Sequence, residues 1–467
     1  MIKRTLAQLA SMCGGELSRP EDDNITVAGV VTDSRKLVPG SLFVPLVGDK
    51  YDGHGYAAAA LEAGAAATLW QRGRGQAPDG AVILVEDTLA ALQALASAYL
   101  AETGCRVVGI TGSNGKTTTK DMVTALLETR FRVHKTSGNF NNHIGLPLTV
   151  LSMPEDTEIA VLEMGMSGRG EIAVLTNIAR PDAAVITNVG EAHLLQLGSR
   201  EEIARAKLEI VLGLRPGGLF VYHGDEPLLA AALQEPEFAA AGDAVPYRFG
   251  LSQDNDNYPT GIMNHGQSVT FTTFKYGERA FTLPLPGLHN VVNALAAMAV
   301  AGHFGVTPEE MAAGLEKLKL TGMRIEVITA PSGLTVLNDA YNASPLSMKA
   351  AIDVLQGMKC SGRRIAVLGD MLELGPDEAR FHAEIGEYLD PDRVDRLFTY
   401  GPLSRHTAEA AAAVFGTDRV HAFEDKAELI GELAKLAGQR DIVLFKASRG
   451  MKLEEAAAAL LASAQRS

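Results

Sequence analysis

One glycine-rich segment constrains the fold of this chain more than any other part of it. Residues 111–119 read Thr-Gly-Ser-Asn-Gly-Lys-Thr-Thr-Thr, and they follow a short β-branched run at 106–110 that is typical of a buried strand. A helical pattern opens within the segment. A strand, a Gly-Lys-Thr loop and a helix in this order are the context of a phosphate-binding loop. The sequence therefore predicts a nucleotide-binding α/β domain.

The residue types within this loop fit the chemistry of ATP binding. The glycines let backbone N–H groups turn toward phosphate oxygens, Lys116 would reach the outer phosphates, and the Thr117 hydroxyl would hold Mg²⁺. The spacing departs from the general GxxxxGK pattern, because Ile110 occupies the first glycine position. A glycine-rich turn with a chance lysine is the alternative, and the flanking strand and helix argue against it. The predicted ATP contacts in the loop are Gly112, Ser113, Asn114, Gly115, Lys116, Thr117 and Thr118.

Short apolar runs alternate with helical patterns along most of the chain, which favours an α/β fold with parallel sheets. With 467 residues the chain is too long for one ordinary core. We expect three domains: a small N-terminal α/β substrate domain (1–86), a central ATPase domain with the phosphate-binding loop and a parallel sheet (87–320), and a C-terminal Rossmann-like domain (321–467). A period-two pattern between 252 and 286 predicts a small antiparallel excursion within the central domain.

The bulk composition limits the classes of partner. The formal net charge of −14 argues against nucleic acid and anionic membranes as partners, so a phosphate-bearing ligand must be held by local groups. No apolar run approaches the length of a membrane span, so we expect no membrane insertion. Three isolated cysteines, Cys13, Cys105 and Cys360, suit a reducing compartment. We therefore expect a cytoplasmic protein, and a monomer.

The phosphate-binding segment closely resembles the TG(T/S)NGKT loop of the Mur ligase family, which also includes folylpolyglutamate synthases. Further motifs of the family follow in order over nearly the whole chain. The resemblance implies an enzyme that uses ATP to convert a carboxylate into an acyl phosphate, which an amine then attacks. It also implies ATP and two Mg²⁺ ions as cofactors.

Three further residues of the central domain match the catalytic motifs of the family. Glu163 and His193 follow predicted strands, and ligands in open α/β sheets gather at that edge. The resemblance implies that both side chains bind the second Mg²⁺. Lys207 lies in Ala-Arg-Ala-Lys-Leu-Glu-Ile, where the family carries a lysine carbamylated by CO₂; without the resemblance it reads as an exposed helical lysine. The implied catalytic residues are Lys116, Glu163, His193 and Lys207, and the implied metal ligands are Thr117, Glu163, His193 and Lys207.

Other matched motifs imply contacts with the nucleotide and the precursor. Asn290 matches the residue that contacts adenine in the family, and Arg324 matches an arginine that contacts the nucleotide. The resemblance also implies that Asp339 lies near the ATP ribose. The Thr-Asp-Ser-Arg segment at 32–35 matches a region that binds the UDP end of the precursor, and 139–145 matches a loop that contacts the muramoyl-peptide. The implied substrate-binding residues are Asp33, Ser34, Arg35, Asn141, Asn142, Tyr341, Asn342 and Ser344.

Flanking motifs favour one member of the family. The chain lacks the DNPR motif of the diaminopimelate-adding member, whereas 338–345, 369–375 and 446–452 resemble the member that adds D-alanyl-D-alanine to UDP-MurNAc-tripeptide. Ser344 replaces the usual asparagine and Ala447 the usual glycine of these motifs. We expect the two small molecules as substrates, with lysine and diaminopimelate both open as the third residue of the tripeptide. The alternatives are a sister Mur ligase, a folylpolyglutamate synthase, or a P-loop switch ATPase that is not a ligase.

Overall fold

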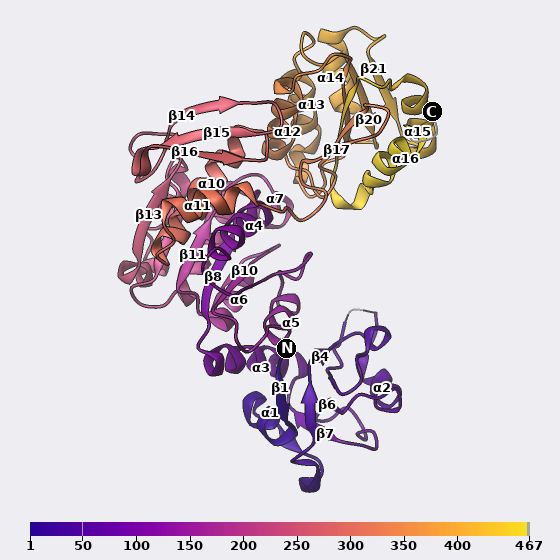
Figure 1. The fold of residues 1–467 in the computed structure, drawn as a ribbon. Helices are drawn as coiled ribbons and strands as arrows, with labels where there is room; N and C mark the ends of the chain where they lie inside the picture. The colour runs from indigo at the N-terminus through magenta and orange to yellow at the C-terminus, as the bar shows by residue number, and fades with distance from the viewer. Residues whose placement is uncertain (49, 465–467) are drawn as a thin grey trace.

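The sheets of the chain occur in consecutive blocks along the sequence, separated in space as well (Figure 1). The computed structural model describes residues 1–48 and 50–464. The N-terminal block lies at the bottom of Figure 1, the central block in the middle, and the C-terminal block at the top right. The predicted α/β architecture with N-terminal, central and C-terminal parts is confirmed, while the division at residues 86 and 320 stays a prediction.

The N-terminal block holds a small mixed sheet in the order β2-β7-β6-β5-β4 and an antiparallel pair, β1 and β3. Within the five-stranded sheet only β2 runs antiparallel to its neighbour. Its elements are β1 (Lys3–Thr5), α1 (Leu6–Cys13), β2 (Glu16–Leu17), β3 (Thr26–Ala28), β4 (Val30–Val31), β5 (Leu42–Phe43), α2 (Ala57–Glu62), β6 (Ala67–Gln71) and β7 (Val82–Val85).

The central block is built on a six-stranded parallel sheet in the order β13-β12-β11-β8-β10-β9. Its elements are α3 (Thr88–Thr103), β8 (Arg106–Thr111), α4 (Lys116–Leu127), β9 (Val133–Lys135), α5 (Gly145–Leu151), β10 (Ile159–Glu163), α6 (Glu171–Ala179), β11 (Ala183–Ile186), α7 (Leu194–Leu197), α8 (Arg200–Leu208), β12 (Leu219–His223), α9 (Pro227–Ala232), β13 (Val245–Phe249), α10 (Leu288–His303) and α11 (Pro308–Glu316).

The predicted antiparallel excursion is confirmed as the three-stranded sheet β14 (Pro259–Asn264), β15 (Val269–Thr273) and β16 (Gly277–Leu283). Alternate residues of β15 are buried, as the period-two pattern requires. In Figure 1 this sheet lies beside the C-terminal block, close to α12.

The C-terminal block holds a six-stranded sheet in the order β17-β18-β22-β19-β20-β21, in which only β17 is antiparallel. Its apolar clusters contain buried residues from 325 to 460, so it has a core of its own. Its elements are β17 (Glu326–Thr329), β18 (Thr335–Asn338), α12 (Pro345–Gly357), β19 (Arg364–Gly369), α13 (Glu378–Tyr388), β20 (Arg396–Tyr400), α14 (Arg405–Phe415), β21 (Val420–Phe423), α15 (Lys426–Leu436), β22 (Ile442–Lys446) and α16 (Glu454–Ala464).

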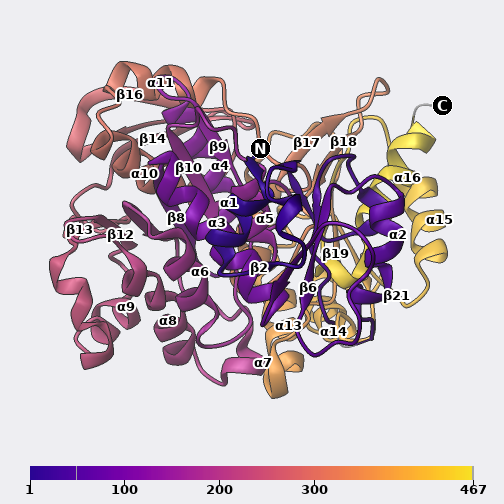
Figure 2. The same cartoon turned by 90° about the horizontal axis from the view of Figure 1, so that it is seen from below.

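The N-terminal and central blocks share one apolar core. A single cluster of buried side chains runs from Leu6 on α1 and Leu69 on β6 through Leu92 on α3 to Leu146 on α5. The Ile2 N–H also donates to the carbonyl oxygen of Leu151 at 2.9 Å. Figure 2 shows α1 and α3 side by side at this junction. The N-terminal block is therefore fixed to the central sheet by burial of apolar surface.

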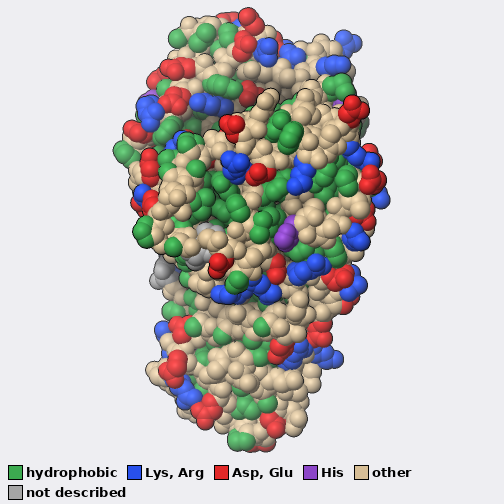
Figure 3. Space-filling model, turned by 90° about the vertical axis from the view of Figure 1, so that its left-hand side faces the viewer, with side chains coloured by type: hydrophobic (Ala, Val, Ile, Leu, Met, Phe, Trp, Pro, Cys, Tyr) green, Lys and Arg blue, Asp and Glu red, His purple; other side chains and the backbone are tan. Residues whose placement is uncertain are grey.

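The surface carries both signs of charge. On the face in Figure 3, basic and acidic side chains are interspersed, and apolar side chains gather over its middle. Among the described residues, no helix combines the length and apolar character needed to cross a membrane.

Candidate active site

The glycine-rich loop lies at the middle of the central parallel sheet. Strand β8, which precedes it, pairs with β10 on one side and β11 on the other. Ile110 is in register with Glu163 on β10, and Thr111 with Ile186 on β11. The chain leaves β8 for β9 and β10 on one side, and later returns to β11 on the other. The loop is therefore at the point where strand order reverses, which is where open α/β sheets bind ligands.

Two glycines make the shape of this loop possible. Gly112 has a φ of +148°, and a Cβ atom there would lie 1.8 Å from Oγ1 of Thr187. Gly115 has a φ of +80°, and a Cβ atom there would lie 2.8 Å from Oδ1 of Asn293. A larger residue at either position would displace the loop from its neighbours.

The N-terminus of α4 is free to meet an anion, because Gly115 at its N-cap provides no side-chain hydrogen bond to its first N–H groups. Lys116, the first residue of α4, donates from Nζ to the carbonyl oxygens of Gly112 (2.7 Å) and Ser113 (3.4 Å). Burial lowers the pKa of its ammonium group, and the nearby Glu163 carboxylate opposes that shift. A phosphate group in the loop would place negative charge next to the Lys116 ammonium group and stabilise its charged form.

Glu163, at the end of β10, is buried with only 2% of its surface exposed. One carboxylate oxygen accepts from the Thr117 hydroxyl at 2.7 Å, and the other accepts from Nδ2 of Asn141 at 2.9 Å. The backbone N–H of Glu163 donates to the Thr136 hydroxyl at 3.0 Å. A carboxylate and a hydroxyl are hard oxygen donors of the kind Mg²⁺ prefers. Asn141 thus holds the predicted metal ligand Glu163, in addition to lining the same cavity.

His193 lies just before α7 in a left-handed conformation, with φ of +66°. Its Nδ1 atom is 2.9 Å from Oε2 of Glu373, which belongs to the C-terminal block. Burial is the largest cause that lowers the His193 pKa, and the charge on Lys116 adds to it. A neutral imidazole fixed through one nitrogen leaves the other nitrogen available as a ligand.

Lys207 differs from the exposed helical lysine that its helix pattern alone indicates. The residue is 1% exposed. Among the residues that the structure describes, its amine forms no hydrogen bond or ion pair. Burial, followed by the nearby charge of Lys116, lowers its pKa well below the usual lysine value. The exposed alternative is therefore wrong, and burial favours the neutral form of the Lys207 amine, which is the form that reaction with CO₂ requires.

The C-terminal block contributes polar side chains from the ends of two adjacent parallel strands. Asp339 follows β18 and Lys446 ends β22, and the two form an ion pair. Lys446 also donates to the Asn342 carbonyl oxygen at 3.1 Å. Arg324 precedes this sheet, and its guanidinium lies 4.1 Å from the centre of the Tyr341 ring. Arg324 and Asp339 therefore both have partners within the block that fix their positions.

A hydrogen bond from the C-terminal block to the glycine-rich loop joins the two halves of the site, in addition to the contact between His193 and Glu373. The Ser344 hydroxyl, at the N-terminus of α12, donates to Oδ1 of Asn114 in the glycine-rich loop at 3.0 Å. The replacement of the usual asparagine by Ser344 therefore still provides a polar contact with the loop.

A cavity of about 410 Å³ lies between the central and C-terminal blocks and gathers most predicted site residues. The predicted site residues that do not line the cavity are Gly112, Lys207, Ser344 and the segment 33–35. Asn290 lines it while its Nδ2 donates to the Pro286 carbonyl oxygen at 2.7 Å. The predicted residues in its wall are Ser113, Asn114, Gly115, Lys116, Thr117, Thr118, Asn141, Asn142, Glu163, His193, Asn290, Arg324, Asp339, Tyr341 and Asn342.

Sequence reasoning missed several residues of the site. Lys446 and Glu373 lie in segments whose motifs it recognised, but neither residue received a role. Asn293 lies close to Gly115, and both Asn293 and His289 line the cavity. Asn142 was predicted as a substrate contact, and its side chain also accepts from Gly145 N at the start of α5 (2.8 Å). The motif around Lys446 marked its segment, but it could not show that Lys446 pairs with Asp339.

His382 makes the stability of the C-terminal block depend on pH. It is fully buried; its Nε2 accepts from the Met371 N–H (2.9 Å), and its Nδ1 donates to the Glu378 carbonyl oxygen (2.7 Å). Burial lowers its pKa, so the unfolded chain binds more protons than the folded one below the ordinary histidine value of about 6.5. The contribution of His382 to the free energy of unfolding should therefore be fully present above that pH and decrease as the solution becomes more acidic.

Thermal unfolding measured between pH 8 and pH 5 tests this loss of stability. Protonation of Nε2 removes the acceptor of the Met371 hydrogen bond, which should lower the free energy of unfolding by about 1–3 kcal/mol. The His382→Gln protein should be less stable at pH 8 but lose less stability on acidification. Equal acid sensitivity in the two proteins would show that His382 is not responsible.

Comparison with known proteins places this geometry in a family. Residues 26–100 match the model described as the Mur ligase family, catalytic domain, residues 110–301 the Mur ligase middle domain, and residues 323–449 the Mur ligase glutamate ligase domain. The chain belongs to the Mur ligase family. The three matches follow the order of the three blocks, and together they include the loop, Glu163, His193, Lys207 and Arg324.

Individual Mur ligases match over almost the whole chain. The UDP-N-acetylmuramoyl-tripeptide--D-alanyl-D-alanine ligase of Bacillus subtilis (strain 168) is 53% identical over 97% of this chain and 98% of its own. A crystal structure of MurF from Acinetobacter baumannii superposes with a TM-score of 0.88 at 30% identity, covering 99% of both chains. MurF ligase from Thermotoga maritima in complex with ADP gives 0.82 at 30% identity, over 94% of this chain and 98% of that one.

Proposed function

We propose that this Mur ligase joins D-alanyl-D-alanine to UDP-N-acetylmuramoyl-tripeptide with ATP, as its Bacillus relative is named for doing. The observation that carries the proposal is the cavity itself. One wall is a phosphate-binding loop with Glu163 and His193, and the other carries Arg324, Asp339 and Lys446. The ADP complex of the Thermotoga relative supports ATP as the nucleotide.

In the first step, the terminal carboxylate of the tripeptide attacks the γ-phosphorus of ATP. An acyl phosphate forms, the bond from the γ-phosphorus to the β–γ bridging oxygen breaks, and ADP leaves. Lys116 and the N-terminus of α4 stabilise the negative charge on the transferring group, while Arg324 approaches it from the C-terminal block. The neutral amine of D-alanyl-D-alanine then attacks the acyl carbon and the bond from that carbon to the phosphate oxygen breaks. The proton that the nitrogen loses is taken up by the departing phosphate, which leaves as HPO₄²⁻ as the amide forms. The residues act mainly by positioning charge and reactants.

The side chains present fit Mg²⁺, although protein groups alone do not complete a site. No group of three or more His, Cys, Asp or Glu side chains that could hold a metal lies within the described ranges. Mg²⁺ is commonly bound by one or two carboxylates together with substrate phosphates and water. Thr117, Glu163 and His193, with Lys207 as a carbamate, would hold two Mg²⁺ ions, which neutralise phosphate charge when bound. The burial of the Lys207 amine, which lowers its pKa, supports the carbamate.

The N-terminal block would bind the UDP end of the precursor through Asp33, Ser34 and Arg35. Asp33 caps the short 3₁₀ helix Ser34–Lys36 and accepts two bonds from the Arg35 guanidinium, both at 2.9 Å. This pairing lowers the pKa of Asp33 to about 2. The Arg35 side chain is 87% exposed, and its Nη1 group, which does not contact Asp33, is the donor that would reach a pyrophosphate.

The Arg35→Ala protein should show a KM for the UDP-precursor raised by about 10- to 150-fold, with the KM for ATP unchanged. The expected size is that of one charge-assisted hydrogen bond, about 1.5–3 kcal/mol. Steady-state kinetics with each substrate varied in turn measures both constants. Lys36→Ala, a neighbouring basic residue without the Asp33 fork, is the matched control. Equal changes in both KM values would mean that the N-terminal block does not bind the precursor.

The proposed partners are thus the two small molecules, with the chain acting as a cytoplasmic monomer. The cysteines support the reducing compartment, because Cys13, Cys105 and Cys360 are all free thiols.

Phosphate release tests the function against its alternatives. Purified protein with ATP should release phosphate only when both D-alanyl-D-alanine and a UDP-MurNAc-tripeptide are present. Parallel reactions with lysine- and diaminopimelate-containing tripeptide identify the precursor. Release that depends on diaminopimelate or glutamate as the incoming amine would indicate a sister ligase or a folylpolyglutamate synthase. Hydrolysis unaffected by any peptide would indicate a switch ATPase.

A further inference from the structure

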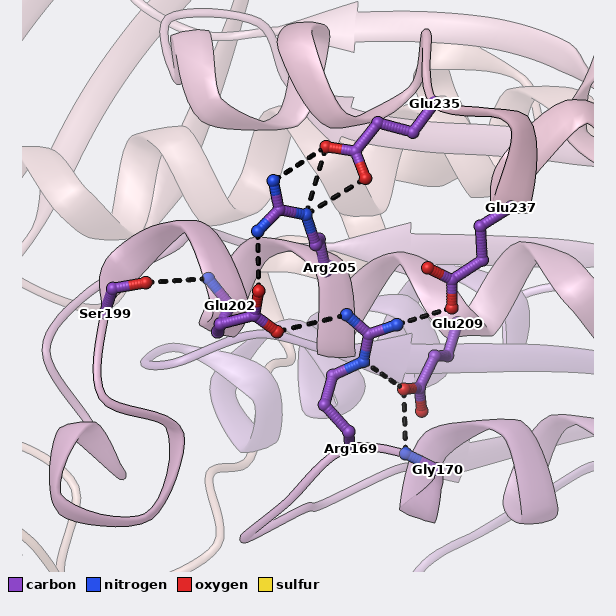
Figure 4. Close-up of polar contacts among 8 residues, drawn as sticks. All are labelled: Arg169, Gly170, Ser199, Glu202, Arg205, Glu209, Glu235 and Glu237. Carbon is purple, nitrogen blue, oxygen red and sulfur yellow. Dashed lines mark hydrogen bonds and ion pairs between the residues drawn. The ribbon is translucent and has the colours of Figure 1, made fainter.

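A network of ion pairs surrounds α8, the helix that carries Lys207 (Figure 4). It has two halves, one centred on each of two arginines, and both arginines contact Glu202. In the outer half, Arg205 binds Glu235 with a bond of 2.9 Å. The members are Arg169, Arg205, Glu202, Glu209, Glu235 and Glu237.

Glu209 is the buried member of this network, with a side chain only 3% exposed. Its Oε1 accepts from Nε of Arg169 (2.9 Å) and from the Gly170 N–H (2.8 Å), and its Oε2 accepts from the Ala173 N–H (3.2 Å). Gly170 is the N-cap residue of α6 and provides no side-chain cap. Glu209 therefore caps α6 from a distant part of the chain, where a carboxylate also complements the helix dipole.

These contacts link the helix that carries Lys207, α8, to the start of α6 beside the cavity. Glu209 follows Lys207 by two residues, where α8 passes into a 3₁₀ turn (Glu209–Gly213). The segment at the start of α6 includes Ser167 and Glu171, which line the cavity. Arg169 also binds Glu202, near the start of α8, at 3.3 Å. The chain on both sides of Lys207 is thus attached to Arg169, which lies between the cavity-lining residues Ser167 and Glu171 in the sequence.

We infer that Glu209, together with Arg169, is a positioning pair that sets where the Lys207 amine lies relative to the glycine-rich loop. The inference rests on the proposed role of Lys207. Among the described residues the amine itself has no hydrogen-bonding partner, so its place depends on the backbone that carries it. The three bonds to Glu209 fix that backbone immediately after Lys207.

Glu209→Gln and Glu235→Gln make a matched pair of variants. Both keep the side-chain size, but only the first changes the cap of α6 and the bond to Arg169, since Glu235 contacts Arg205 alone. Glu209→Gln should lower kcat by about tenfold, as loss of a residue that orients a ligand commonly does, with the KM for ATP unchanged. The carbamate signal from ¹³CO₂ in NMR should weaken in the same protein. Glu235→Gln should match the unaltered protein in both measurements.

The same substitution in a Lys207→Ala background separates positioning from general structural damage. Activity in that background is measured with added acetate. If Glu209 acts through Lys207, Glu209→Gln should leave this residual kcat unchanged. An equal loss in both backgrounds, or an unaltered kcat and carbamate signal in Glu209→Gln alone, overturns the inference while leaving the role of Lys207 intact. Full activity of Lys207→Ala without acetate overturns both.

Discussion

The Lys116→Ala protein should fold normally and lose ATP-dependent ligation, with kcat lower by about 10²–10³-fold. Lys116 supplies the only cation of the glycine-rich loop itself, at the N-terminus of α4. Its ammonium group now bonds only to carbonyl oxygens of that loop, so alanine removes no contact with another element. Phosphate release at saturating ATP measures the loss, and thermal unfolding measures folding.

Lys317→Ala is the control for this change, because Lys317 is exposed at the end of α11, outside the cavity. It should retain the turnover of the unaltered protein. Near-normal turnover of Lys116→Ala at saturating ATP would contradict the phosphate-binding role of the loop.

The Lys207→Ala protein should lose about 10²-fold in kcat, because the metal region loses a carbamate oxygen donor. Its stability should change little: removing the buried, unpaired amine is favourable, whereas the space left by the side chain is unfavourable. Acetate or another short carboxylate should partly restore turnover by placing a free oxygen donor where the carbamate was. Phosphate-release kinetics with and without acetate measures both effects.

Lys207→Arg serves as the charge-conserving comparison. Guanidinium keeps its charge and does not form a carbamate, so this protein should stay inactive and should not respond to acetate. NMR with ¹³CO₂ should show the carbamate in the unaltered protein alone. An arginine variant with normal turnover would contradict the carbamate, and the second metal would need another ligand.

Much of the fold and the site could be predicted because its signals are local. The glycine-rich loop, the strand before it and the helix after it are contiguous, and the parallel strands of α/β sheets end at one edge. That rule correctly brought Glu163 and His193 to the cavity. Short, partly exposed strands such as β17 and β21 were not predicted, since few of their residues are buried and their pattern is weak.

Contacts between distant segments could not be predicted. Nothing in the sequence pairs Glu373 with His193 or Ser344 with Asn114, because such pairs depend on how two blocks pack. The burial of Lys207 could not be predicted from its helix pattern either. Lysine is almost always exposed, so its helix pattern alone indicated a solvated residue. Its burial follows from the packing of α8 within the central block, and only the family motif pointed to it.

The apolar core that the N-terminal block shares with the central sheet has a consequence for the exchange of modules between related enzymes. Leu92 on α3 and Leu146 on α5 pack in the same cluster as Leu6 and Leu69. A chimaera that took residues 1–86 from a ligase with another precursor would need matching side-chain volumes on both sides of that cluster. The C-terminal block, with its own core clusters, is the more readily interchangeable unit. A change of precursor is therefore better attempted by single substitutions within the N-terminal block than by grafting that block whole.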